Sequence, residues 1–202
     1  MKDLFKGVKK FCSEEYIRNR ELFEKLKESQ TPHTLFICCS DSRVLPDIIT
    51  ESLPGELFVV RNIANIVPYW RHSDEYLSTT SAIEYAVMAL EVENIVVCGH
   101  SNCGGCKALM NPGSTGEMVH VAKWMELAAP VREILSSMPE GKDKQICAEK
   151  ENVLQQIKHL MSYPFIKKRS EEGKLNVYGW YYDIGSGAVY NYDRDKREFT
   201  RI

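Results

Sequence analysis

The sequence feature that most constrains the fold is a set of three short apolar runs, each followed by a polar loop. The runs cover residues 34–39, 57–61 and 94–98, and Pro, Gly or Asp bounds each of them. Apolar runs of this length predict strands that are buried on both faces. Between the last two runs, residues 75–90 carry apolar side chains at helical spacing, at Ile83, Val87 and Leu90. The order strand, crossover helix, strand is typical of a parallel α/β sheet.

The rest of the chain adds helices and a hairpin. From residue 3 to about residue 28, apolar residues recur at helical spacing, which predicts an arm of one or two amphipathic helices. Helices are also predicted at residues 119–135 and 151–161, with the polar residues 139–144 as the loop between them. Near the C-terminus, two segments rich in Tyr, Val and Trp flank a Gly-Ser-Gly sequence and predict a hairpin, at residues 174–183 and 188–192.

The predicted fold class is therefore α/β, with a mainly parallel central sheet flanked by helices, a C-terminal antiparallel edge hairpin and an N-terminal helical arm. A chain of 202 residues fits one domain. We expect a single domain over residues 1–202, in which residues 1–30 form the helical arm and residues 31–202 form the α/β core.

The composition excludes several classes of protein. An apolar share of 44% and a charged share of 27% are ordinary for a globular protein and argue against disorder. The net charge is −2 and the basic residues are dispersed, so nucleic acid is not an expected partner. No run approaches the ~18 apolar residues of a membrane span, and the N-terminus lacks the apolar core of a secretion signal. The cysteine count, seven, is odd. We therefore expect no membrane partner and a cytoplasmic location with free thiols.

Two polar clusters follow the predicted strands. Residues 39–43 read Cys-Ser-Asp-Ser-Arg, at the carboxyl end of the first strand, where ligands of open parallel sheets gather. If the backbone stays extended there, Cys39, Asp41 and Arg43 point the same way. The second cluster contains His100 and Cys103, which would share one face of a helix at i and i+3.

Two cysteines and one histidine are a ligand set of catalytic zinc, whose fourth position stays open. The sequence thus predicts one zinc ion per chain, held by Cys39, His100 and Cys103. Taken alone, each residue has an ordinary explanation as core or surface, and their joint position after two parallel strands favours the metal site. Cys106 completes a Cys-x-x-Cys pattern with Cys103, which leaves a structural zinc module or a redox pair as an alternative.

These motifs resemble those of the β-class carbonic anhydrases. The resemblance rests on residues 39–43, on the His-x-x-Cys pattern at residues 100–103, on Pro-Gly-Glu-Leu-Phe-Val-Val-Arg-Asn-Ile-Ala-Asn at residues 54–65, and on Ala-Ile-Glu-Tyr-Ala at residues 82–86. It is specific over residues 30–105 and looser beyond them. It implies a zinc lyase (carbonate dehydratase) that reversibly hydrates carbon dioxide to bicarbonate and a proton. It also implies a homodimer or an assembly of dimers, with N-terminal helices that wrap a partner and a pocket at the subunit boundary.

Within that family the chain most resembles the plant-like subgroup. The subgroup's pocket pattern falls on Gln30, Phe58 and Tyr85, and Ile63 would add to the apolar wall that an uncharged substrate needs. A second subgroup, which has a regulatory bicarbonate pocket, carries a Trp where this chain has Phe36. That departure argues against bicarbonate regulation.

The ligand charges indicate why Asp41 and Arg43 are needed. Zinc with two thiolates and an imidazole is roughly neutral, so its water is harder to ionise than water on zinc held by histidines alone. We expect Asp41 to accept a hydrogen bond from zinc-bound hydroxide as it attacks carbon dioxide, while Arg43 keeps Asp41 ionised. A relative that hydrolyses carbon disulfide or carbonyl sulfide could share every one of these residues, so it stays a rival interpretation.

Overall fold

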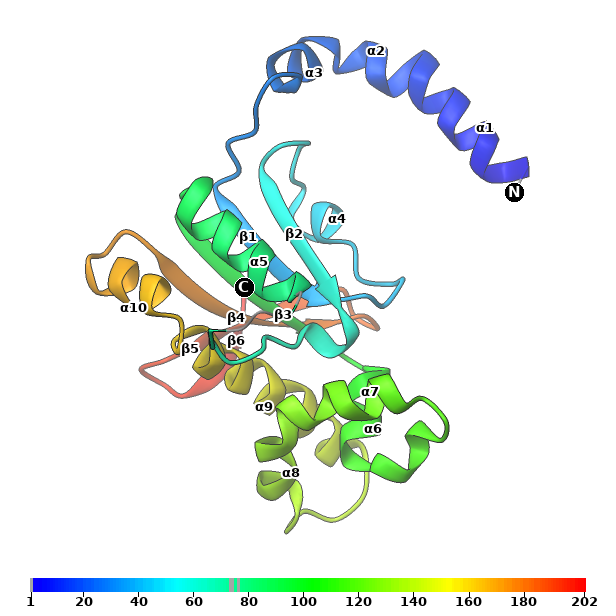
Figure 1. Ribbon diagram of the computed structural model, residues 1–202. Helices are drawn as coiled ribbons and strands as arrows, with labels where there is room; N and C mark the ends of the chain where they lie inside the picture. The colour runs from blue at the N-terminus through cyan, green and yellow to red at the C-terminus, as the bar shows by residue number, and fades with distance from the viewer. Residues whose placement is uncertain (1, 73–74, 76) are drawn as a thin grey trace.

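A six-stranded sheet forms the centre of the computed structural model, which describes residues 2–72, 75 and 77–202 (Figure 1). The strand order is β2-β1-β3-β4-β5-β6. The strands are β1 (Thr34–Cys39), β2 (Leu57–Asn62), β3 (Asn94–His100), β4 (Asn176–Asp183), β5 (Ala188–Asp193) and β6 (Glu198–Arg201). The first four are parallel and the last two pair antiparallel. The predicted fold class is confirmed, and the predicted hairpin is extended by a third strand, β6.

The two faces of the sheet are covered differently. Alternation along β1 sends Leu35 and Ile37 to one face, where they join the main core beneath the helices α5 (Ser78–Glu84), α9 (Lys142–Leu160) and α10 (Pro164–Glu171). Phe36 and Cys38 point to the other face, where the short helix α4 (Pro46–Thr50) and Trp180 pack against them. The main core therefore lies on the α9 face of the sheet.

Two predicted helices have different bounds in the structure. The predicted helix 119–135 is divided into α7 (Val119–Met125), the 3-10 turn Glu126–Ala128 and α8 (Ala129–Leu135). The helix predicted at residues 151–161 is α9, which begins at Lys142, so the predicted loop 139–144 is wrong in its second half. The inward face of α9 was not recognised because several of its buried residues are polar and so break the apolar periodicity: Glu149, Asn152, Gln155, Gln156 and His159.

The crossover helix is confirmed as α5 followed by the π-helical turn Tyr85–Ala89, and residue 76 of the predicted range lies outside the described residues. The helix α6 (Gly104–Met110) follows β3. None of the described helices is both long and apolar enough to span a membrane.

The N-terminal arm is helical and projects away from the body of the molecule (Figure 1). It consists of α1 (Lys2–Lys10), the π-helical turn Phe11–Glu15, α2 (Tyr16–Arg18) and α3 (Arg20–Leu26). None of these four segments contains a buried residue. Large apolar side chains are exposed along it, at Leu4, Phe5, Val8, Phe11 and Ile17. The predicted amphipathic pattern is thus present, and its apolar face lies open in the single chain.

Six described residues other than glycine adopt a left-handed backbone conformation. Ala64 and Asn65 do so in the loop after β2, and Asn102 does so in the turn after β3. The other three follow α4, the turn 85–89 and β5, at Glu51, Glu91 and Arg197. Side chains with a Cβ atom are strained in this conformation, Asn less than the others.

Candidate metal centre

Three potential metal ligands meet at the carboxyl ends of β1 and β3. Cys39 is the last residue of β1 and His100 is the last residue of β3, and the two strands are parallel neighbours. Cys103 follows His100 by one turn of chain. Their ligand atoms all lie within 4.8 Å of one another, and the three residues are 5%, 0% and 1% exposed. The structure therefore brings together the three residues predicted as zinc ligands.

The loop from His100 to Cys103 is a tight turn. Asn102 adopts a φ of 56°, and α6 begins only after Cys103. The expectation that His100 and Cys103 share a helix face is therefore wrong, because the turn itself returns Cys103 to the histidine. Ser101 fixes the turn to β4: its amide donates to the Tyr182 carbonyl at 2.9 Å, and its Oγ accepts from the Ile184 amide at 2.9 Å.

The imidazole of His100 is arranged for coordination. Its Nδ1 lies 3.0 Å from the Ser101 carbonyl, which only a protonated Nδ1 can bind. Its Nε2 is then an acceptor, and it is buried with no hydrogen-bond partner among the residues that the structure describes. An orphaned buried acceptor costs free energy unless a cation or donor meets it. Together with two thiols, this donor set fits zinc.

Both thiols are held in their neutral form by the protein alone. The adjacent Cys103 thiol, followed by burial, raises the pKa of Cys39 to about 12. The neighbouring Cys106 raises the pKa of Cys103, with burial adding to the effect. Metal binding therefore has to displace protons from sulfur, as is general for thiolate sites.

Asp41 and Arg43 form an ion pair beside the three ligands. Arg43 donates from Nε to Asp41 Oδ1 at 2.9 Å and from Nη2 to Oδ2 at 2.8 Å. This bidentate pair holds the pKa of the Asp41 carboxyl well below its usual range. Asp41 Oδ2 lies 3.9 Å from His100 Nε2. The carboxylate is therefore ionised and faces the ligand set.

A turn, and not an extended backbone, produces this convergence. Residues 42–43 form the turn, and the Arg43 amide donates to Asp41 Oδ1 at 3.0 Å. The predicted alternation of side chains after Cys39 is wrong for this reason. The Arg61 side chain, from β2, supports the loop by donating to the carbonyls of Cys39 at 3.2 Å and Asp41 at 2.7 Å.

Ile63 is the predicted pocket residue that lies near the ligands. A Cβ atom on Gly105 would stand 3.2 Å from Ile63 Cγ2 and 2.7 Å from the Ala64 Cβ. The loop after β2 therefore packs against the start of α6, directly after Cys103. Glycine is required here for that close approach. Ile63 is 40% exposed, so part of its apolar side chain is open to solvent.

The other three predicted pocket residues lie at the opposite end of the sheet. Phe58 pairs with Leu35, four positions before Cys39 in β1, which corresponds to ~13 Å along a strand. Tyr85 packs on Phe58, with ring centroids 5.9 Å apart. Gln30 is exposed and precedes the start of β1. Within one chain, Gln30, Phe58 and Tyr85 are not brought to the metal ligands.

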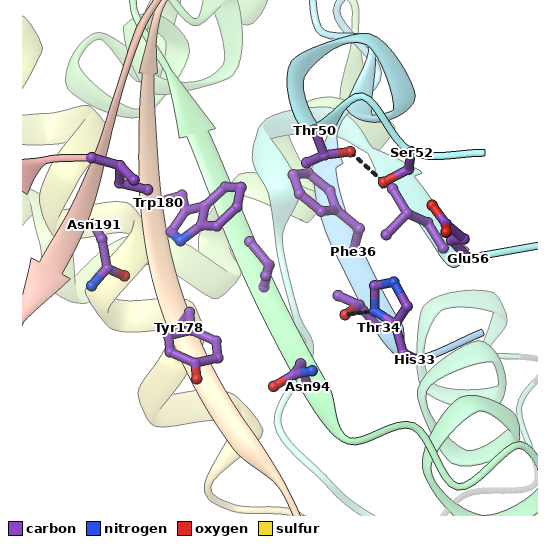
Figure 2. A pocket seen from close by; sticks show the side chains of 13 residues that line it. His33, Thr34, Phe36, Thr50, Ser52, Glu56, Asn94, Tyr178, Trp180 and Asn191 are labelled. Atoms are coloured by element: carbon purple, nitrogen blue, oxygen red, sulfur yellow. Dashed lines mark hydrogen bonds between the residues drawn. The ribbon is translucent and has the colours of Figure 1, made fainter.

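A groove of about 600 Å³ lies on the α4 face of the sheet and is separate from the metal centre (Figure 2). Phe36, Tyr178 and Trp180 form its apolar floor, and polar side chains such as His33 and Asn94 stand at one end of it. The Phe36 and Trp180 rings meet edge to face, with centroids 5.8 Å apart. Cys39, His100 and Cys103 are not among the residues that line this groove.

Sequence reasoning missed Glu149, a buried acidic residue that contacts the ligand loop. Glu149 of α9 is 1% exposed and accepts a hydrogen bond from the Cys103 amide at 3.0 Å. Burial raises the pKa of Glu149, and the hydrogen bonds that its carboxylate accepts lower the pKa in part. Its signal in the sequence is a polar stripe at helical spacing that includes Asn152, Gln156 and His159.

The chain is similar to known carbonic anhydrases along its whole length. The family model described as carbonic anhydrase matches residues 34–189. The carbonic anhydrase of Helicobacter pylori strain J99 is 38% identical over 207 residues, which cover 99% of this chain and 94% of that protein. The carbonic anhydrase of Synechocystis is 41% identical over 204 residues, which cover 99% of this chain and 74% of that protein.

Solved structures give the same picture. The β-carbonic anhydrase CcaA superposes with a TM-score of 0.95 at 40% identity, over 100% of this chain and 92% of that chain. A tetrameric β-carbonic anhydrase from the ascomycete Sordaria macrospora superposes with a TM-score of 0.81 at 36% identity, over 93% of this chain and 94% of that chain.

Proposed function

The chain belongs to the β-class carbonic anhydrases, enzymes that interconvert carbon dioxide and bicarbonate, and from this premise we propose that its reaction takes place at a zinc ion held by Cys39, His100 and Cys103. The observation that carries the proposal is the buried His100, whose Nε2 has no hydrogen-bond partner among the described residues and which offers a ligand nitrogen within 4.8 Å of both thiols. When bound, zinc would supply a Lewis acid that yields a nucleophile from water. We propose that each chain binds one zinc ion with these three ligands.

Asp41 and Arg43 act on the attacking oxygen. Asp41 is ionised by its bidentate pair with Arg43 and faces the ligand set, so it accepts a hydrogen bond from that oxygen and orients its lone pair toward the carbon of carbon dioxide. Arg43 holds the carboxylate in place, and its Nη2 also reaches the Asn102 carbonyl at 3.3 Å. The proton released in the reaction leaves to solvent.

The substrate pocket is shared between two copies of the chain. Gln30, Phe58 and Tyr85 match the pocket pattern of the plant-like subgroup, and together with Phe36 in place of the second subgroup's Trp they lead us to place the chain in the plant-like subgroup. Gln30, Phe58 and Tyr85 lie at the opposite end of the sheet from the zinc ligands of their own chain. They therefore line the pocket beside the zinc ligands of a partner chain.

A pocket that is shared between two chains requires a homodimer or an assembly of dimers. The open apolar face of the arm and the groove on the α4 face provide surfaces that a second copy covers. The relative from Sordaria macrospora is tetrameric. We place the protein in the cytoplasm because its seven cysteines are free thiols.

Stopped-flow hydration of carbon dioxide tests the proposed function. The zinc-loaded wild-type protein should accelerate hydration at about pH 8 to 9, where a thiolate-ligated water is expected to ionise. Asp41→Ala should keep its zinc and lose about 100-fold or more in rate, because one positioned hydrogen-bonding group is removed. A fully zinc-loaded wild-type protein with no rate above buffer, or an Asp41→Ala variant with the full rate, contradicts the proposal.

A further inference from the structure

Glu149 is a buried carboxylate that the proposed reaction does not use. It lies on α9 and is 1% exposed. Its described partners are hydrogen-bond donors and include no cation: the Cys103 amide at 3.0 Å from Oε1, the Gln145 side-chain amide, and the Tyr181 hydroxyl at 3.0 Å from Oε2. The amide of Asn102 also faces it. The carboxylate is thus fully engaged as an acceptor.

Such a carboxylate is not explained by packing. Removing an acid from water costs free energy that hydrogen bonds only partly restore, and an apolar residue of similar size is usually at least as stabilising in a core. Its neighbour Ala148 and Val153, one turn further along α9, are buried apolar residues. What distinguishes Glu149 from them is its contact with the backbone of a proposed zinc ligand.

The peptide groups on both sides of Cys103 are held from α9. Its amide donates to Glu149, and its carbonyl accepts from the Gln145 side chain at 3.5 Å as well as from the Lys107 amide at 3.1 Å. The turn that precedes Cys103 contains Asn102 in a left-handed conformation, which persists only where the surroundings enforce it. Fixing the Cys103 amide fixes the direction of its Cα–Cβ bond, and hence the place of its sulfur.

We propose that Glu149 is a positioning residue of the metal centre, which holds the Cys103 backbone so that the sulfur of Cys103 lies opposite Cys39 and His100 before metal binds. The inference rests on the proposed role of Cys103 as a zinc ligand. Glu149 acts through the ligand and touches neither substrate nor metal. Partners of this kind orient ligands in metal sites, and their loss lowers metal affinity by about 10- to 100-fold.

Cobalt binding to the full-length, metal-stripped chain tests this role. Co²⁺ reports thiolate coordination through its sulfur-to-metal absorption band, and competition with Zn²⁺ gives the zinc affinity. Glu149→Ala should bind both metals about 10- to 100-fold more weakly than the wild type, with an altered cobalt band. Glu149→Gln, which keeps one oxygen acceptor of the same shape, should lie between the two. The matched control is Gln155→Ala, because Gln155 is a buried α9 residue that contacts Tyr69 and His159 and not the ligand loop.

The outcomes separate the two proposals. Wild-type cobalt affinity and an unchanged band in Glu149→Ala overturn the positioning role, and so does an equal loss of affinity in Gln155→Ala, which would make the effect one of general stability. If Glu149→Ala does not fold, Glu149→Gln decides by the same criteria. Cys103→Ser tests the ligand set independently of Glu149. An unchanged cobalt band in that variant overturns the proposed zinc site. The carbonic anhydrase activity of the wild type is tested separately, by its turnover.

Discussion

At the scale of single residues, the sequence predicted that Cys39, His100 and Cys103 lie together, which the structure confirms, but it did not predict how the chain brings them together. Cys39 and His100 end two strands that are parallel neighbours and Cys103 lies three residues further on, so topology brings all three to one edge of the sheet. We expected an extended backbone after Cys39 and a shared helix face for His100 and Cys103. The structure has neither of these. Two turns bring the ligands together instead, and turn conformations depend on contacts with distant residues such as Tyr182 and Arg61.

Zinc content distinguishes the ligand set from the Cys-x-x-Cys alternative. Cys106 lies against Cys103 but does not belong to the group of ligand atoms within 4.8 Å. Elemental analysis should therefore find about one zinc per chain in Cys106→Ser and almost none in Cys39→Ser, because a catalytic site has three protein ligands. Loss of zinc from Cys106→Ser would instead favour the structural or redox module.

At the scale of elements, α9 is the helix that sequence patterning described least well. Its inward face carries polar side chains that bind the loop after β2: the Asn152 side chain donates to the Ala64 carbonyl at 2.9 Å, and the Val67 amide donates to Gln156 at 2.9 Å. Apolar periodicity cannot reveal such a face, since the partners of these side chains are backbone groups of another element. A search for buried polar stripes at helical spacing could have found it.

The pH dependence of stability should report on the same helix. His159 is fully buried, its Nδ1 donates to the Val67 carbonyl at 2.6 Å, and burial lowers its pKa below the ordinary 6.5. The unfolded chain therefore takes up a proton first as the pH falls, so this contribution to stability is complete above pH 6.5 and declines from there toward the lowered folded pKa. Urea unfolding from pH 8 to pH 5 should show this decline.

His159→Gln is the variant that isolates the effect. It should be less stable at pH 8, by about 1 to 3 kcal/mol for a buried hydrogen-bonding group, and its stability should fall less steeply than that of the wild type below pH 6.5. Equal slopes in both proteins would show that other groups cause the acid instability.

At the scale of the whole molecule, the sequence pattern identifies the residues of the proposed pocket, but it does not reveal that three of them lie far from the proposed metal ligands within one chain. Gln30 precedes β1 and Phe58 lies near the start of β2, so both belong to the amino end of a parallel sheet. The metal ligands belong to the carboxyl end. Periodicity within one chain does not encode where a second chain is placed.

Mixing two impaired variants tests the shared pocket. Cys39→Ser and Tyr85→Ala should each be impaired, whereas a mixture that is dissociated and reassembled should regain up to about a quarter of the wild-type sites, because random pairing gives half mixed dimers with one intact site each. A mixture of Cys39→Ser with Cys103→Ser should regain nothing, since both changes damage the same set of ligands. Recovery in neither mixture would indicate that each chain builds its own pocket.

The left-handed residues divide the molecule into parts that differ in how freely they tolerate engineering. Glu51, Glu91 and Arg197 lie after α4, after the turn 85–89 and between β5 and β6. Glycine at each of them should relieve strain and raise the free energy of unfolding by up to about 1 kcal/mol, which calorimetry would detect as a higher melting temperature. Ala64, Asn65 and Asn102 lie in the loops around the ligands. Glycine substitutions that raise thermal stability should therefore be made at Glu51, Glu91 and Arg197. Glycine at Ala64, Asn65 or Asn102 should also relieve strain, but it would loosen the loops that position the catalytic site.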